Sequence, residues 1–163
     1  MKKIIVISLI VLIGLSGCSG CSGWRNSTGL LGTKIANNQL SEQNSPIRYT
    51  SVESEYGVSS QPYLLGKTAP SVADTLLKTD VLNLIKKKED TQNIKLVQTR
   101  FLSRNINPLT FYEIWVIKRG DDNDLHAYTV QLKNSSQGGV DIVLQGAARV
   151  FENTLKEEIE HDK

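Results

Sequence analysis

The chain has few of the residues that usually carry chemistry. Among its 163 residues there are two cysteines and two histidines. A zinc site needs three or four ligands, so these residue types are too scarce to predict one. The sequence also lacks a G-x-S-x-G turn, an S-x-x-K run, a phosphate-binding loop and a dinucleotide fingerprint. We therefore expect no enzyme activity, no catalytic residues, no bound metal and no cofactor.

An excess of charge of one sign is also missing. The chain has 19 basic and 17 acidic side chains, which gives a formal net charge of +2. Lys2 and Lys3 lie in a segment that we expect to be removed, so the mature chain is close to neutral. The cluster of Lys86, Lys87 and Lys88 is too short to follow a phosphate backbone. Nucleic-acid binding is therefore not expected.

The N-terminus has the organisation of a secretory signal peptide. Two lysines precede an apolar run from Ile4 to Ile13, and mostly small residues follow before Cys18. The apolar run is about half as long as the roughly twenty residues that a helix needs to cross a bilayer. We therefore predict that residues 1–17 are a cleaved signal peptide rather than a membrane-spanning anchor.

The end of this segment, Leu15-Ser16-Gly17-Cys18, resembles the lipobox of bacterial lipoproteins. The resemblance implies transfer of diacylglycerol to the Cys18 sulfur, cleavage before Cys18 and acylation of the new amine. Two or three chains hold a protein stably on a membrane, whereas one holds it only marginally. A lipid-modified Cys18 is not a thiol, so it cannot form a redox pair with Cys21.

Ser19, directly after Cys18, bears on which membrane holds the protein. By analogy with Gram-negative lipoproteins, a serine there favours the outer membrane, with the chain facing the periplasm. The inner membrane and the cell surface remain alternatives.

Residues 18–69 are rich in Ser, Asn, Gln, Gly and Thr and have no sustained apolar period. One interpretation is a long, irregular and flexible tether with a coil dimension of about 40 Å. The other is an arm that becomes ordered on a partner, because its scattered apolar residues exceed what a spacer needs. These residues are Leu30, Leu31, Ile35, Tyr49, Tyr56, Tyr63, Leu64 and Leu65. The sequence leaves both interpretations open.

Residues 70–163 are expected to form a small α+β head domain. Ser71 and Asp74 approximate a capping box, and the following apolar residues recur at helical spacing, so a helix is predicted over 71–88. Four strand-like stretches follow, which indicate an antiparallel meander: 94–103, 109–119, 125–133 and 140–145.

A second helix is predicted after Gly146, extending to about Ile159, and we expect both helices to pack on one face of the sheet. The Trp115 strand, the Tyr128-Thr129-Val130 strand and the Gly138-Gly139 turn are similar to the small cystatin-like or NTF2-like heads of some bacterial lipoproteins. This resemblance covers about forty residues, which is a small part of the chain.

The strand over 109–119 carries the candidate contact residues, because it is apolar on both faces. Phe111, Tyr112 and Trp115 are either partner contacts or ordinary core residues. Glu113 between them has a raised pKa if it is buried alone, or it pairs across strands with a cation. The candidate cations are Arg100, Lys118 and Lys133. His126 is expected to be a packed residue, or one at the margin of the sheet, rather than a general base.

These features favour a membrane-anchored periplasmic lipoprotein without enzyme activity. We expect a structural or interaction subunit of a cell-envelope assembly, for example the outer-membrane part of a secretion or transfer complex. A small-ligand binder with an apolar pocket lined by Trp115 and Tyr128 is an alternative. An envelope hydrolase would need polar groups that converge near Glu113 or His126.

Overall fold

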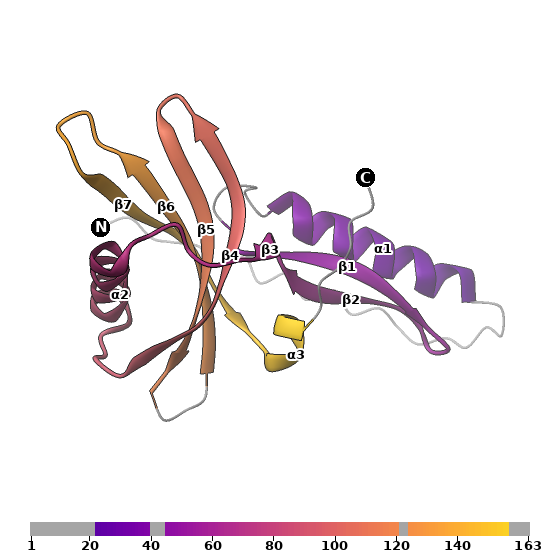
Figure 1. Ribbon diagram of the computed structural model, residues 1–163. Coiled ribbons are helices and arrows are strands. Elements are labelled where there is room, and N and C mark those ends of the chain that lie inside the picture. The colour runs from indigo at the N-terminus through magenta and orange to yellow at the C-terminus, as the bar shows by residue number, and fades with distance from the viewer. Residues whose placement is uncertain (1–21, 40–44, 121–123, 157–163) are drawn as a thin grey trace, which may run out of the picture.

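The computed structural model describes residues 22–39, 45–120 and 124–156, and shows a twisted sheet from which a narrower arm projects (Figure 1). The elements are α1 (Ser22–Gln39), β1 (Ile47–Ser54), β2 (Gly57–Leu64), β3 (Lys67–Thr68), α2 (Thr75–Glu89), β4 (Ile94–Ile106), β5 (Leu109–Arg119), β6 (Asp124–Asn134), β7 (Val140–Val150) and α3 (Glu152–Lys156). The predicted lipidation residue Cys18 and the predicted signal peptide lie outside the described residues. None of the helices within the described ranges is long and apolar enough to cross a membrane.

The main sheet is antiparallel and has the strand order β3-β4-β5-β6-β7. The α+β class is therefore confirmed, and four of these strands form the predicted meander. The sheet also has a fifth strand that the sequence did not indicate. Lys67 and Thr68 form this short β3 and pair with Phe101 and Arg100 of β4.

Helix α2 begins four residues later than predicted, at Thr75. Asp74 is its N-cap, and its carboxylate accepts a hydrogen bond from the Leu77 backbone N–H at 2.8 Å. The predicted role of Ser71 in a capping box is wrong. Its hydroxyl donates to Glu113 instead, because the chain is still extended there and runs along the sheet.

The predicted second helix is wrong over 147–150. Strand β7 continues through this stretch to Val150, since β6 still supplies backbone partners there: Ala127 lies opposite Ala148, and Leu125 lies opposite Val150. The helix that follows, α3, has five residues within the described part of the chain. Residues 157–159 of the predicted helix lie outside the described residues.

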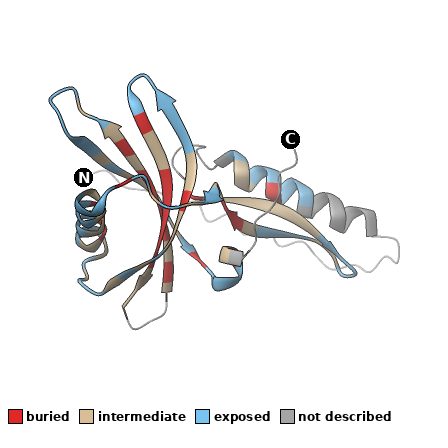
Figure 2. Cartoon of the chain, viewed as in Figure 1, coloured by how far each residue is buried: buried red, intermediate tan, exposed pale blue. Residues whose placement is uncertain are grey.

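The two faces of the sheet bury different sets of residues. Figure 2 shows that the buried residues run as a stripe along the central strands. On one face, Trp115 and Ile117 of β5 pack with Val81 and Ile85 of α2. On the other face, a second cluster includes Leu64 at the end of β2 and Leu155 of α3. The prediction that both helices pack on one face is therefore wrong. Strand β5 is apolar on both faces because it is covered on both.

The arm consists of α1 and the β1–β2 hairpin, within the segment that was predicted to be irregular. Asn37 donates to and accepts from the backbone of Tyr49, both at 2.8 Å, and the Ser51 hydroxyl donates to Thr33 at 3.0 Å. The irregular tether is therefore wrong for the described residues, and the arm is ordered by contacts within the chain. These contacts are polar and distant in sequence, so they produce no apolar period.

Candidate functional site

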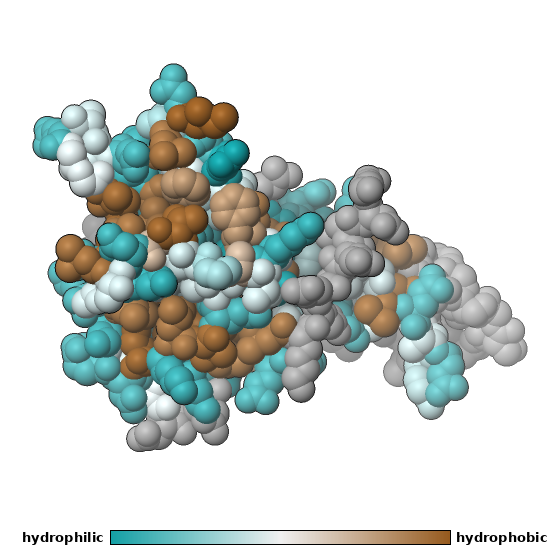
Figure 3. All heavy atoms as spheres, viewed as in Figure 1, coloured by the Kyte–Doolittle hydropathy of each residue, from teal (hydrophilic) through white to brown (hydrophobic). Residues whose placement is uncertain are grey.

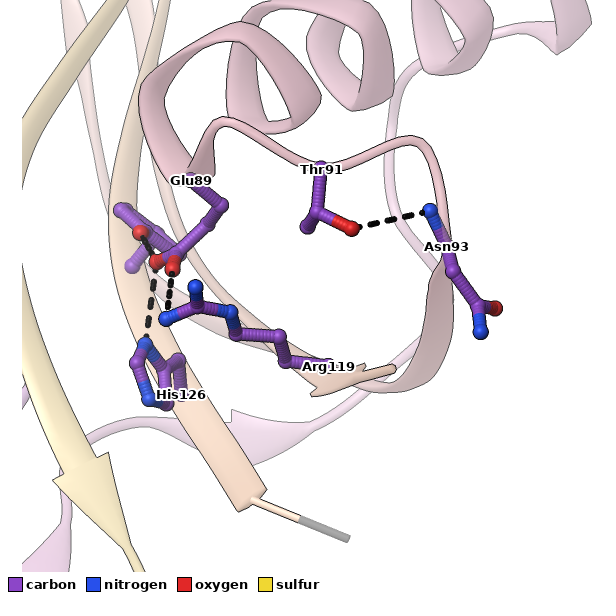
Figure 4. A network of polar contacts seen from close by, with 6 residues as sticks. Glu89, Thr91, Asn93, Arg119 and His126 are labelled. Atoms are coloured by element: carbon purple, nitrogen blue, oxygen red, sulfur yellow. Dashed lines mark hydrogen bonds and ion pairs between the residues drawn. The ribbon is translucent and has the colours of Figure 1, made fainter. Parts of the chain in front are cut away.

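Among the described residues, a group of four interacting titratable side chains lies where the end of α2 meets β5 and β6, and we call it the Glu89 cluster (Figure 4). It comprises Glu89, Arg119, His126 and Tyr128. The Tyr128 hydroxyl donates to Glu89 Oε1, and His126 Nδ1 lies 3.0 Å from the same oxygen. Arg119 Nη1 lies 3.3 Å from Oε2. Both carboxylate oxygens are therefore occupied by groups of the protein.

Alternation along β6 explains why His126 and Tyr128 both reach Glu89. Side chains two positions apart in a strand point to the same face, and α2 covers that face here. Because a carboxylate is an acceptor, His126 Nδ1 must carry the proton that it shares with Glu89. His126 is largely buried and packs in this cluster. That arrangement agrees with the expectation that it is a packed residue.

The electrostatics of the cluster favour an ionised Glu89 and a neutral Tyr128. Burial by itself would raise the pKa of Glu89, but hydrogen bonds from Tyr128 and His126, with the charges of His126 and Arg119, outweigh burial and lower it. The pKa of Tyr128 is raised, first by burial and then by its hydrogen bond to Glu89 and that carboxylate's charge. At neutral pH the phenol is therefore a donor to a carboxylate.

A carboxylate at the C-terminal end of a helix opposes the helix dipole. Here Arg119 offsets that cost, and the last turn of α2 also contains Lys86, Lys87 and Lys88. Lys88 Nζ additionally lies 5.3 Å from the centroid of the Tyr128 ring, which is a cation–π distance. The Glu89 cluster thus fixes the end of α2 to the sheet.

A second carboxylate, that of the buried Glu113, fixes the other end of the same helix. Its Oε2 accepts from the Ser71 hydroxyl and from Trp115 Nε1, each at 2.7 Å. Its Oε1 accepts from the Val72 backbone N–H at 2.7 Å. Ser71 and Val72 belong to the segment that leads into α2. The two carboxylates, Glu89 and Glu113, therefore hold α2 against the sheet at both ends.

The predicted ion pairing of Glu113 with Arg100, Lys118 or Lys133 is wrong. The strand register explains it, because Arg100 lies opposite Ile114 and Lys133 lies opposite Thr110. These positions, like Lys118 itself, alternate with Glu113 along β5 and therefore lie on the other face of the sheet. The buried charge is satisfied by three hydrogen-bond donors rather than by a cation.

The predicted partner contacts do not lie together. Trp115 is 0% exposed and belongs to the core beneath α2, so its role as a surface contact is wrong. Phe111 is partly buried against the same core, while Tyr112 alternates with it onto the opposite face. An apolar pocket between Trp115 and Tyr128 is also wrong, since both side chains are fully packed.

One depression in the described surface, of about 510 Å³ and open to solvent, lies beside the end of α2. The residues that line it are all polar or charged: Asn83, Lys86, Lys87, Asp90, Thr91 and Gln92. Among the residues that the structure describes, no group of three or more Cys, His, Asp or Glu side chains is arranged to hold a metal ion. The arrangement of both carboxylates is that of groups that hold elements together.

Sequence reasoning missed Glu89 and Arg119 because neither belongs to a motif. A signal was nevertheless present, since an acidic residue at the C-terminal end of a helix opposes the helix dipole and gains from a cationic partner elsewhere in the fold. Comparisons of the chain with protein-family models, with curated proteins and with solved structures find no match. The resemblance of the head to cystatin-like or NTF2-like domains stays a prediction.

Proposed function

We propose that this protein is a lipoprotein anchored through Cys18 in the outer membrane, and that its sheet binds another protein of a cell-envelope assembly in the periplasm. The lipobox and the preceding apolar run support the anchor. The distribution of polar and apolar side chains on the folded part supports the role in binding. No enzyme activity is proposed, because the carboxylates of Glu89 and Glu113 are engaged with groups that hold α2.

The observation that carries the binding role is an exposed apolar area at the end of the sheet beyond α2. Ile106 is 81% exposed, and it pairs directly with Leu109, which is also exposed. Leu109 lies on the same face as Phe111, and Val140 of β7 reaches that face beside Asn134. We call Ile106, Leu109 and Val140 the distal apolar row.

The distal apolar row continues an apolar surface rather than standing alone. The next row of the same face contains Phe111, Leu132 and Ile142, which join the core beneath α2. Figure 3 shows apolar side chains gathered up the sheet to the tip of the β4–β5 hairpin. Contiguous apolar surface of this kind marks interaction sites more often than scattered single residues do.

The anchor is tested by a Cys18→Ser change. Lipid transfer to sulfur requires the thiol, so the variant should remain an uncleaved precursor that lacks the lipid mass. Mass spectrometry of the protein from its own membrane distinguishes the two forms. Normal processing and release of the variant would contradict the lipoprotein assignment.

The binding role is tested by gentle crosslinking and affinity isolation of the intact lipoprotein from its membrane. The wild type should recover an envelope protein, and Ile106→Asp should recover much less of it. Val97→Asp is the matched control, because Val97 is an exposed aliphatic residue of the same strand away from its tip. Recovery of the monomer alone, or equal recovery with both variants, would contradict the proposal.

A further inference from the structure

The arm has an exposed apolar face on α1 that nothing in the described structure covers. Leu31 is 57% exposed and Ile35 is 49% exposed. The two residues are one helical turn apart, so their side chains lie on the same face. Leu30 is also exposed, but at 100° per residue it lies 100° or more around the helix from both.

The opposite face of α1 holds the hairpin. Thr33 is buried and bonds to Ser51, and Asn37 bonds to the backbone of Tyr49. At 100° per residue, Leu31 and Ile35 lie about 140° and about 180° from the direction midway between Thr33 and Asn37. The apolar face of α1 therefore points directly away from the rest of the protein.

The direction of α1 sets which end of the arm is nearer to Cys18. Going back along α1 from Asn37 to Thr33, the bonded partners move forward along β1 from Tyr49 to Ser51. The start of α1 therefore points to the β1–β2 turn, at the end of the arm away from the sheet (Figure 1). Ser22, where α1 begins, is four residues after Cys18. An extended chain of four residues spans about 14 Å at most.

The charge of α1 also has one sign. Its sequence contains Arg25 and Lys34 and no acidic residue. Lys34 is exposed and lies between Leu31 and Ile35 in sequence. A helix with exposed aliphatic residues, basic residues in its sequence and no acidic charge is suited to the interface of a bilayer that contains anionic lipid.

We infer that the outward face of α1, centred on Leu31 and Ile35, rests on the surface of the membrane that holds the lipid anchor. This inference depends on the proposed anchor at Cys18, because the anchor brings α1 within reach of the bilayer. Helix α1 then acts as a second, non-covalent contact with the lipid. The arm holds the sheet beside the membrane in a defined orientation, rather than on a loose tether.

The test uses the full lipoprotein, purified from its membrane and reconstituted into vesicles that contain anionic lipid. Cys21→Ser removes the other cysteine, and Leu31→Cys provides a single thiol for a polarity-sensitive fluorophore. The matched control is Leu76→Cys, because Leu76 is a 73% exposed leucine on α2 of the head. Spin-labelled lipids in the bilayer quench only a fluorophore that touches lipid.

The label at position 31 should shift to shorter emission wavelength and lose most of its fluorescence to spin-labelled lipid, whereas the label at position 76 should do neither. Equal behaviour at both positions would overturn the inference. So would a blue shift at position 31 that depends on protein concentration without lipid quenching, because α1 would then contact a second copy. Mass spectrometry of the same preparation shows whether Cys18 is acylated. If it is acylated and position 31 is unquenched, the inference fails while the anchor stands.

Discussion

The Tyr128 hydroxyl on β6 donates a hydrogen bond to the carboxylate of Glu89, the last residue of α2, which lies 39 residues earlier in the chain. This contact, with those of His126 and Arg119, fixes one end of α2, and Glu113 fixes the other. The position of α2 on the sheet therefore depends on the partly buried carboxylate of Glu89 and the buried carboxylate of Glu113, as well as on the apolar core. Four predictions follow from this arrangement and from the backbone that leads into it.

Glu89→Gln should lower the free energy of unfolding by about 1–3 kcal/mol. The amide keeps the size of the side chain but removes the charge that strengthens the bonds from Tyr128, His126 and Arg119. Urea denaturation followed by circular dichroism measures the change. Glu55→Gln is the control, because Glu55 is exposed at the hairpin turn and should be neutral. Equal stability of the two variants would show that the Glu89 cluster does not hold α2.

The stability of the protein should fall in acid partly through Glu89. Its pKa in the folded state lies below the ordinary value of 4.5, so the folded chain keeps this charge to lower pH than the unfolded chain does. The contribution is fully present above pH 4.5 and is lost as the pH falls through the lowered pKa. The difference in unfolding free energy between wild type and Glu89→Gln should therefore shrink on acidification below pH 4.5. A difference that stays constant down to the acid transition would contradict the lowered pKa.

Glu113→Ala should be more damaging than Glu113→Gln. Alanine removes the acceptor of three donors, from Ser71, Val72 and Trp115. The Trp115 side chain is fully buried, and its unsatisfied N–H alone costs about 1–3 kcal/mol. Glutamine keeps one acceptor oxygen and should lose less. Near-ultraviolet circular dichroism and the fluorescence of Trp115 report whether the core beneath α2 has loosened. The reverse order of the two variants would refute this role for the carboxylate.

Gly66→Ala should destabilise the protein by about 2 kcal/mol or more. Gly66 has φ +75°, and a Cβ there would lie 2.5 Å from the Phe101 carbonyl oxygen, where the chain approaches β4 to form β3. Gly32→Ala is the matched control. A Cβ at this exposed position of α1 meets nothing within 4 Å, so alanine should stabilise the helix by about 0.5–1 kcal/mol. Thermal unfolding of the two variants should therefore shift in opposite directions.

Local periodicity predicted the head better than the arm. The strand over 109–119 and the helix after Pro70 were found because their apolar residues repeat within one element. The hairpin of β1 and β2 was missed because it is mostly polar and half-buried. Its order comes from pairing with the other strand and from contacts of α1, such as Asn37 with Tyr49.

The candidate site also has a part that local sequence predicts and a part that only the tertiary structure shows. His126 and Tyr128 could be assigned to one face of their strand from alternation alone, and His126 was expected to pack. Glu89 could not be joined to them, because a carboxylate at a helix end acquires its partners only when the helix docks. The sequence allowed Trp115 to be either a partner contact or a core residue. Only the packing of α2 on that face decided that it is a core residue.

The sequence by itself determined the α+β class, the meander of β4 to β7 and the helix before it, because each follows from apolar residues spaced within a single element. The tertiary structure alone decided the ordered arm, the fifth strand β3, the extension of β7 to Val150 and the contacts by which Glu89 and Glu113 join α2 to the sheet. Each of these depends on hydrogen-bond partners that lie far away in the chain. No local pattern of residues contains that information.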